Sequence, residues 1–443
     1  MPEKRESFAS APSLIMATPE HVYFVIDARS FYASVEAVDR GLDPLTTDLV
    51  VADESRTEKT ICLAVSPSLK EKGVKNRCRL FDVPKNMDII IAKPRMKRYI
   101  EIAAEIYGIY LKYLSKDDIH VYSIDEVIMD VTSYLKLYKI KAKDFALKLM
   151  DEVKTTLGIP QTAGIGTNMY LAKVASGLMA KHDPQGVGWL TEERFIKVCS
   201  HVRPLKSFWM ISEGTEARLN RLGIFDMAGI READEDMLYD EFGVNAELLI
   251  DHAYGREPTR MEDIKNYKSQ SQSITTNQIL ACPYSFADAR NIVKEMVQAF
   301  CLELARRGLV SSRLGVSILY ADRPRKRGYR PDCHFNVDIL GQGNLSSLFL
   351  PPALEIYDNK VDPNRMVKSI AMGFADVKEA EAQTYSLFDD TDEIAREKNL
   401  RDSLLKIEEK FGKNAVLKGN DFTSKSTQRE RNLFIGGHSG GEE

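Results

Sequence analysis

The feature that most constrains the fold of this 443-residue chain is an adjacent acidic pair, Asp125 and Glu126, set between apolar residues. Val127 and Ile128 follow the pair and favour a β-strand, so the acids stand at a turn or at a strand end. Two carboxylates held near a core repel each other and lose hydration, and they are tolerated there if they bind a cation or a strong donor. An ordinary acidic β-turn tip explains the same residues, and both interpretations stay open at this point.

A second acid ends a second strand. The run Val22 to Ile26 predicts a buried strand, Asp27 follows it, and Ser30 is a plausible N-cap for a helix. An acid at the end of a buried strand is a typical ligand position in open α/β sheets. The alternative is that Asp27 caps the turn and that Phe31 and Tyr32 are core aromatics.

The rest of the chain divides by its periodicity. Residues 21–185 alternate strand and helix patterns, which predicts a mixed α/β domain with a small subdomain inserted near 37–85. Residues 186–262 are helical. Two short helices around the glycine turn at 208–224 suggest either a helix-hairpin-helix, whose N–H groups suit phosphates, or a plain αα-hairpin. The Ser-, Gln- and Thr-rich residues 263–278 are expected to be a linker.

A second α/β module is expected over residues 279–376, followed by a polar tail over 377–443 with one helix, 394–411. Although the net charge is −4, residues 268–334 contain eleven Lys and Arg against five Asp and Glu. A basic loop within this region suits phosphate contacts, although a simple solvated charge run would look the same. Its cations are Arg323, Arg325, Lys326, Arg327 and Arg330.

The cysteine spacing and the hydropathy limit where in the cell the protein is expected. Six scattered cysteines without a CxxC pair predict a reducing compartment and exclude a zinc module or a disulfide framework. No apolar run approaches the roughly 20 residues of a membrane span. Residues 1–20 are too polar for a secretory signal and are expected to be a loose arm. We therefore expect a cytoplasmic protein with no membrane partner.

Asp27, Asp125 and Glu126 come from two strands of one predicted sheet. Three such carboxylates can hold two Mg²⁺ ions, and two ions about 4 Å apart suit in-line phosphoryl transfer. On a helix downstream, Lys173 supplies a point charge suited to a triphosphate. A two-metal nuclease or a nucleotide cyclase would use the same acids. A catalytically inactive DNA-binding accessory protein is the alternative from outside the enzymes.

Three motifs resemble those of the Y-family DNA polymerases, the lesion-bypass enzymes, in order and spacing. They are Ile26-Asp27 with Ser30 to Glu36, Tyr122 to Glu126, and Gly164 to Gly166 with Asn168 to Ser176. The resemblance covers about residues 20–376, strongly to 185. The C-terminal stretch through residues 435–438 resembles the UmuC-like branch of Gram-positive bacteria.

The resemblance implies an α/β multidomain right hand and template-directed DNA synthesis of the kind used in DNA repair and SOS mutagenesis. The palm would be 21–185 with small fingers near 37–85, the thumb 186–262, the linker 263–278, the little finger 279–376 and the C-terminal tail 377–443. The partners would be primer-template DNA and dNTPs, and we expect a monomer.

The resemblance also implies residue roles. Asp27, Asp125 and Glu126, with the backbone carbonyl of Ala28, would bind two Mg²⁺ ions, with Mn²⁺ as a substitute. Asp27 and Asp125 would bridge both ions, and Glu126 would serve the ion at the primer 3′-OH. Phe31 would pack under the incoming nucleotide, Tyr32 would lie under its sugar as a steric gate against a 2′-OH, and Lys173 would contact the triphosphate.

Two further expectations concern the fingers and the tail. Many relatives grip the triphosphate with a Tyr or Asn and an Arg, but this chain has Ser66 to Lys70 there. Lys70 replaces the charge of that Arg but not its bidentate fork. Gln383, Tyr385, Leu387 and Phe388 resemble a sliding-clamp-binding peptide; an acidic tail that happens to contain two apolar residues is the alternative.

Overall fold

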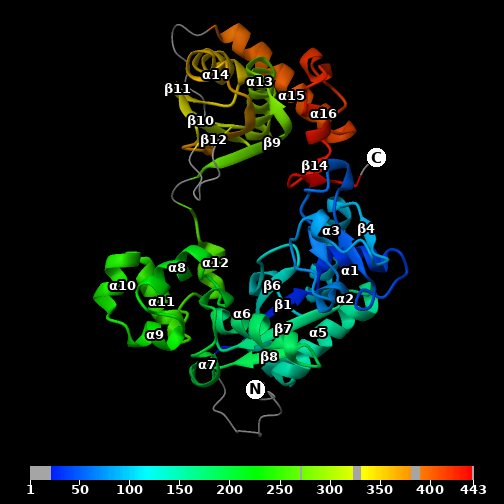
Figure 1. Ribbon diagram of the computed structural model, residues 1–443, viewed down its shortest axis with the longest axis vertical. Helices are drawn as coiled ribbons and strands as arrows, with labels where there is room; N and C mark the ends of the chain where they lie inside the picture. Colours follow the sequence, from blue (N-terminus) through cyan, green and yellow to red (C-terminus); the bar gives the residue numbers. More distant parts are fainter. Residues whose placement is uncertain (1–20, 270–271, 323–330, 381–389, 442–443) are drawn as a thin grey trace. The chain divides into compact units, whose positions relative to one another are not determined.

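The computed structural model describes residues 21–269, 272–322, 331–380 and 390–441 of the chain (Figure 1). It divides into two compact units, Met1–Tyr267 and Lys268–Glu443. Among the described residues, no helix combines the length and the apolar character that crossing a membrane requires.

The first unit is built around a mixed five-stranded sheet. Its order is β5-β6-β1-β7-β8, with antiparallel pairs except for the parallel pair β7–β8. The last strand lies beyond residue 185, so the sheet extends past the expected palm range. The strands are β1 (Tyr23–Ala28), β5 (Ile119–Val121), β6 (Glu126–Asp130), β7 (Gln161–Gly166) and β8 (Val187–Leu190).

Helices cover both faces of this sheet. Phe24 and Ile26 of β1 pack into the large core that includes residues of α1 (Phe31–Val38), α3 (Met96–Tyr110) and α5 (Ala142–Leu157). Tyr23 and Val25 point to the other face and pack with Met169 and Ala172 of α6 (Met169–Leu178). Because side chains alternate along a strand, Asp27 follows Tyr23 and Val25 onto the α6 face.

A small three-stranded sheet is inserted between α1 and α3. Its order is β3-β2-β4, and its core includes Val50, Val65 and Leu69. The sheet reaches residue 92, beyond the range 37–85 expected for the insertion. Its elements are β2 (Leu49–Val51), β3 (Ala64–Val65), α2 (Pro67–Glu71) and β4 (Ile90–Ala92).

The rest of the first unit is helical. A core that includes Phe195, Leu219 and Met227 joins these helices and also contains Leu171 of α6. The predicted glycine turn lies between α8 and α9, where Gly223 has a φ of +81°. The helices are α4 (Thr132–Leu137), α7 (Glu192–Cys199), α8 (Glu213–Arg221), α9 (Met227–Glu232), α10 (Glu235–Phe242), α11 (Asn245–Ala253) and α12 (Met261–Asn266).

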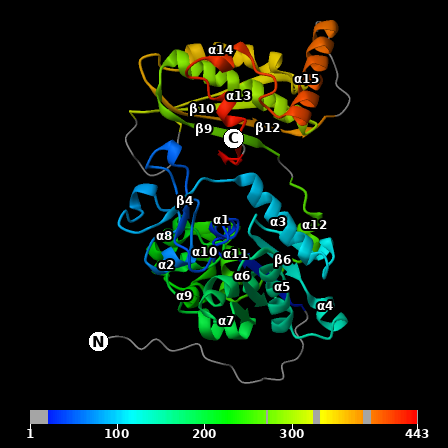
Figure 2. The same cartoon turned by 90° about the vertical axis from the view of Figure 1, so that its right-hand side faces the viewer.

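The second unit contains an antiparallel sheet of order β11-β10-β12-β9, with helices α13 and α14 over one face (Figure 2). Leu314, Val316 and Ile318 of β10 point into the core under these helices. The elements are β9 (Ile274–Tyr284), α13 (Phe286–Arg306), β10 (Leu309–Tyr320), β11 (Cys333–Gly343), α14 (Ser346–Lys360), β12 (Val367–Ala375) and β13 (Lys378–Glu379), which pairs with β10.

Two parts of the second unit differ from the sequence expectations. Residues 274–278, expected in a linker, begin strand β9. The region expected to be a tail packs on α13, where buried Glu295 accepts hydrogen bonds from the backbone N–H of Thr427 and from Asn420. This C-terminal region contains α15 (Thr391–Phe411), α16 (Gln428–Arg431), β14 (Phe434–Ile435) and β15 (His438–Ser439).

Candidate active site

Strand register brings two of the three predicted acids together. In the antiparallel pair of β1 and β6, Asp27 lies directly opposite Glu126. The pairing continues past the strand ends, because the backbone N–H of Ala28 donates to the carbonyl of Asp125 at 2.9 Å. Directly opposed residues have their Cβ atoms about 5 Å apart on one face of the sheet. The sequence motifs at residues 27 and 125–126 therefore meet where β1 ends and β6 begins, at one end of these two neighbouring strands.

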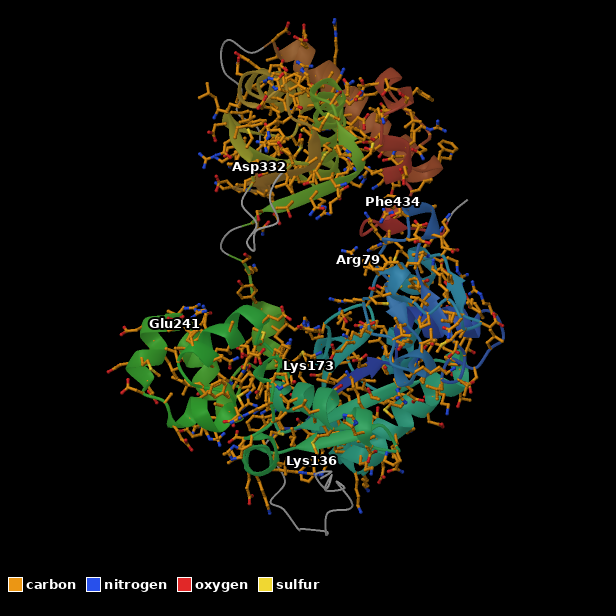
Figure 3. The ribbon with its side chains drawn as sticks, viewed as in Figure 1. Arg79, Lys136, Lys173, Glu241, Asp332 and Phe434 are labelled. Carbon is orange, nitrogen blue, oxygen red and sulfur yellow. The ribbon has the colours of Figure 1, made fainter. Side chains whose placement is uncertain are left out.

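Helix α6 brings a lysine to the same place (Figure 3). The helix lies very close to the sheet, because a Cβ at Gly164 would stand 2.0 Å from the carbonyl oxygen of Ala172. At Gly166 a Cβ would stand 2.2 Å from the nitrogen of Ala172. Only glycine permits this approach of helix to strand. Lys173 follows Ala172 on α6. The two glycines of β7 therefore bring the Lys173 side chain close to the sheet, because they let the helix approach it.

The acids next to Asp27 already have partners. The ammonium of Lys173 donates to both carboxylate oxygens of Glu126. The Ser123 hydroxyl donates to Asp125 Oδ1 at 2.6 Å. These contacts satisfy charges that would otherwise be costly to desolvate.

Tyr122 connects Lys173 to the helical part of the unit. The Lys173 ammonium lies 4.9 Å from the centre of the Tyr122 ring, a cation–π contact. The Tyr122 hydroxyl accepts a hydrogen bond of 3.0 Å from the indole N–H of Trp209. The turn that carries the acidic pair is therefore tied to a residue that packs against the helical core.

The electrostatics of Asp27 follow from this crowding. Burial, together with the neighbouring charges of Glu126 and Asp125, raises the pKa of Asp27 to about 6, although Lys181 and Lys173 act in the opposite direction. A carboxyl that shares a site with two other carboxylates gives up its proton reluctantly unless a cation joins them. The raised pKa of Asp27 is thus a consequence of its burial beside two other acidic side chains.

The donor set fits divalent cations. Mg²⁺ prefers carboxylate and carbonyl oxygens, and the two strand ends offer three carboxylates and the carbonyl of Ala28. Within residues 21–269, 272–322, 331–380 and 390–441, no three His, Cys, Asp or Glu side chains are already gathered as a metal cluster. The contacts of Glu126 with Lys173 and of Asp125 with Ser123 account for this arrangement, because each turns a carboxylate toward a protein donor.

The predicted nucleotide contacts lie just after Asp27. Ser30 adopts a left-handed conformation (φ 49°, ψ 46°) at the start of α1, which begins with Phe31 and Tyr32. Lys70 of the small sheet subdomain donates to the Ser30 hydroxyl at 2.8 Å. Partial burial and the charge of Lys181 lower the pKa of Lys70, although Asp27 acts in the opposite direction. Ser66 caps α2 through its hydroxyl, which accepts from the N–H of Leu69.

The sequence patterns did not reveal every residue at this site. Lys181 acts electrostatically on both Asp27 and Lys70, and its only signal was its place after the helix that carries Lys173. Tyr99 stacks on Tyr32 from α3, and no local pattern marks it as a site residue. Two predicted groups lie outside the described residues: the basic loop with Arg323, Arg325, Lys326, Arg327 and Arg330, and the peptide with Gln383, Tyr385, Leu387 and Phe388.

Comparisons with known proteins agree with this geometry. The model of the impB/mucB/samB family matches residues 26–177, which include all three acids and Lys173. A DNA polymerase IV 2 of Bacillus subtilis (strain 168) is 26% identical over 424 residues, 95% of this chain and 99% of that protein. The DNA repair protein homolog YozK of the same organism is 39% identical over 108 residues, 24% of this chain and 94% of that protein.

The fold has a solved counterpart. The structure of a Y-family DNA polymerase chimera aligns with a TM-score of 0.63 at 19% identity, covering 81% of this chain and 100% of that one. The likeness extends well beyond the matched family segment, and it confirms the predicted right-hand fold. The chain therefore belongs to the impB/mucB/samB family and has the fold of a Y-family DNA polymerase.

Proposed function

We propose that the chain is a template-directed DNA polymerase of the lesion-bypass type, which extends a primer 3′-OH with dNTPs. The observation that carries the proposal is the register of Asp27 against Glu126, with Asp125 beside them and Lys173 held over the same sheet edge. In the reaction the primer oxygen attacks the α-phosphorus and pyrophosphate leaves. The protein contributes positioning and charge rather than a covalent intermediate.

Asp27, Asp125, Glu126 and the carbonyl of Ala28 would hold two Mg²⁺ ions. Those ions supply Lewis acidity at the primer oxygen and at the phosphates. Asp27 must be ionised before it can bind a metal ion, because a protonated carboxylic acid is a poor ligand. Asp27, Asp125 and Glu126 would each contribute carboxylate oxygens to these ions, and the chain contributes no covalent intermediate.

Lys173 is proposed to contact the triphosphate. In the structure its ammonium is shared by both oxygens of Glu126 and stands over the ring of Tyr122. When Glu126 serves as a ligand, the ammonium becomes available to a phosphate oxygen from the same place. Lys70 is proposed to assist from the small sheet subdomain, where it already reaches the turn at Ser30.

Tyr32 is proposed to select the sugar. It follows Asp27 by five residues, opens α1, and is only partly buried, so one side of its ring can face a nucleotide. A ribose would place its 2′-OH against this ring, whereas a deoxyribose would not. Phe31 is buried beside it and would support the nucleotide from below.

The open face of the second sheet is proposed to contact DNA. Its middle consists of small residues, Gly315, Ala371 and Gly373, which lie next to one another across β10 and β12. Arg313 lies on the same face, where it pairs with Asp338 of β11. A flat surface of this kind allows a sugar–phosphate backbone to lie close, which positions DNA without reading its sequence.

The small sheet subdomain supports the assignment to lesion bypass. Three short strands of two or three residues each form its sheet, so little protein is available to close over a nascent base pair. An open site should tolerate damaged templates. Binding of a sliding clamp through residues 383–388, a monomeric state and a cytoplasmic location stay predictions.

The proposal is tested by primer extension with Mg²⁺. Asp125→Asn should reduce extension by about a thousandfold or more, because one ligand charge of the site is lost. Asp130→Asn is a matched control at the other end of β6, where Asp130 accepts from Thr132 and has no place in the site. Equal extension by Asp125→Asn and wild type would refute the assigned role. A template with an abasic site tests bypass, and a stall as complete as that of a replicative polymerase would contradict it.

A further inference from the structure

The Tyr32 ring rests on a second tyrosine that comes from a different part of the chain. Tyr99 of α3 stacks on it with ring centroids 4.5 Å apart and an interplanar angle of 17°. Tyr99 is fully buried, whereas Tyr32 is only partly buried. Stacked aromatic rings attract each other beyond the effect of the area that they bury. Tyr99 therefore forms a fixed wall behind the ring that we have placed at the sugar.

The position of Tyr99 is itself fixed by a buried carboxylate. Its hydroxyl donates to Glu36 Oε1 at 2.8 Å, and Glu36 is 0% exposed. Arg95 donates to both oxygens of Glu36, at 2.9 and 3.0 Å, and Arg40 donates to Oε2. Because a buried carboxylate without its donors is strongly destabilising, this network holds the Tyr99 ring in one place.

These contacts follow one another along the facing sides of α1 and α3, and we call them the ladder. Tyr32 and Glu36 are four residues apart on α1, and Arg95 and Tyr99 are four residues apart at the start of α3. Residues at this spacing share a helix face, so the stacked pair and the ion pair are neighbouring rungs. Asp39 adds a third rung through Arg95 and Arg98. A tilt of the Tyr32 ring toward α3 is blocked by Tyr99, which the contacts of Glu36 hold in place.

We propose that Tyr99 is a positioning residue for sugar selection: it fixes the plane of the Tyr32 ring so that a ribose 2′-OH clashes with it and a deoxyribose does not. The inference rests on the proposed role of Tyr32. A steric gate works only while its ring cannot tilt away, and the burial of Tyr99 on Glu36 removes that freedom. Tyr99 touches no reacting atom, so it acts on the nucleotide only through Tyr32.

The test compares single-nucleotide insertion of dNTP and rNTP and reports the ratio of their kcat/KM values. Tyr32→Ala should lower the ratio by about a hundredfold, and Tyr99→Leu by about tenfold, as expected when a contact group is misplaced by about 1 Å. The loss for Tyr99→Leu should come from easier ribonucleotide insertion, with kcat for dNTP changed less than about threefold. Tyr99→Phe keeps the stacked ring and should keep most of the ratio.

Two further variants make the readout specific. Tyr110→Leu removes another buried tyrosine of α3, whose hydroxyl accepts from Gln161 and which does not stack on Tyr32. It should lower stability without changing the ratio. The double variant Tyr32→Ala/Tyr99→Leu should show the ratio of Tyr32→Ala alone, because Tyr99 acts only through that ring.

The outcomes separate this inference from the role of Tyr32. A wild-type ratio for Tyr99→Leu, beside a lowered ratio for Tyr32→Ala, would overturn this inference alone. An unchanged ratio for Tyr32→Ala would overturn the gate and this inference with it. If Tyr99→Leu does not fold, Tyr99→Met, whose unbranched side chain adapts to an irregular cavity, serves in the same comparison, with the same result required.

Discussion

The two large sheets of the molecule differ in how helices pack on their faces. The sheet of the first unit is covered on both faces, by α3 and α5 on one side and by α6 on the other. Among the described residues of the second unit, α13 and α14 pack on one face of its sheet, and the residues of β10 that point to the other face are partly or fully exposed. The first sheet therefore buries almost every side chain of its central strand, whereas the second presents a row of small and polar residues to its surroundings.

The difference teaches where each kind of function can be placed. In the first sheet, charged groups occur where the strands end, and there burial together with the neighbouring carboxylates raises the pKa of Asp27. In the second sheet, Gly315 and Gly373 keep a broad surface flat, which suits contact with an extended partner. The first sheet therefore gathers charged groups at its strand ends, whereas the second offers small side chains on one face.

The largest expected effect contrasts a glycine from each sheet. Gly164→Ala would place a Cβ 2.0 Å from the carbonyl oxygen of Ala172, so α6 must move and the free energy of unfolding should fall by about 3 kcal/mol. In Gly315→Ala the nearest atom is Asn336 Oδ1 at 3.3 Å, an exposed side chain that can shift, and the change should stay within about 0.5 kcal/mol. Urea unfolding of both variants measures this, and equal losses would remove the contrast.

A smaller effect concerns protons at the covered sheet. Because the pKa of Asp27 is raised to about 6, the folded metal-free protein keeps this proton up to about pH 6, whereas the unfolded chain loses it near pH 4. Between these values rising pH should destabilise the metal-free protein through Asp27. Below about pH 6 the affinity for Mg²⁺ should fall by about tenfold per pH unit, and above it should level off.

Thermal unfolding at pH 5, 6 and 7, with and without Mg²⁺, measures both parts of this pH dependence. Asp27→Asn should raise the midpoint of the metal-free protein at pH 7 and abolish the Mg²⁺ response. Asp322→Asn is the control from the second unit, where Arg365 lowers the pKa of Asp322, and it should leave the Mg²⁺ response intact. A pH-independent Mg²⁺ response in the wild type would contradict the assignment of Asp27.

The smallest effect concerns the open sheet. Ser317 lies on the uncovered face of β10, so Ser317→Glu places a negative charge where phosphates are proposed to lie. The affinity for primer-template DNA should fall by about threefold to tenfold at low salt, and less at high salt. Asn359→Asp adds the same charge on α14, on the covered side, and should have little effect. Equal losses in the two variants would show that only net charge matters.

Much of the covered sheet could be predicted from the sequence, because the central strand β1 is an apolar run that ends in Asp27. Strand β1, strand β7 and helix α6 lie where the patterns placed them, and Asp27 and Glu126 lie on neighbouring strands of one sheet, as expected. A strand buried on both faces leaves little ambiguity about what it is.

The open sheet could be predicted only in part. The first half of strand β9 contains the polar run Thr275 to Gln278, and its buried core residues, Leu280 and Tyr284, come later, so its first residues resemble a linker. Its partner β12 lies far along the chain, and no local pattern reports that pairing. Helix α15 has no buried residue and attaches through polar contacts such as that of Arg306 with Glu408. Apolar periodicity cannot detect such a contact, and for the same reason the stacking of Tyr99 on Tyr32 was not predicted.

The left-handed conformation of Ser30 has a consequence for how this site can change during evolution. A single residue with positive φ reverses the chain between the strand that carries Asp27 and the helix that carries Tyr32. Gly, Asn and Asp adopt this conformation readily, whereas β-branched residues are strongly disfavoured there. The spacing between the carboxylate and the aromatic ring is thus inherited as one unit, and drift at position 30 is confined to a few small polar residues and glycine.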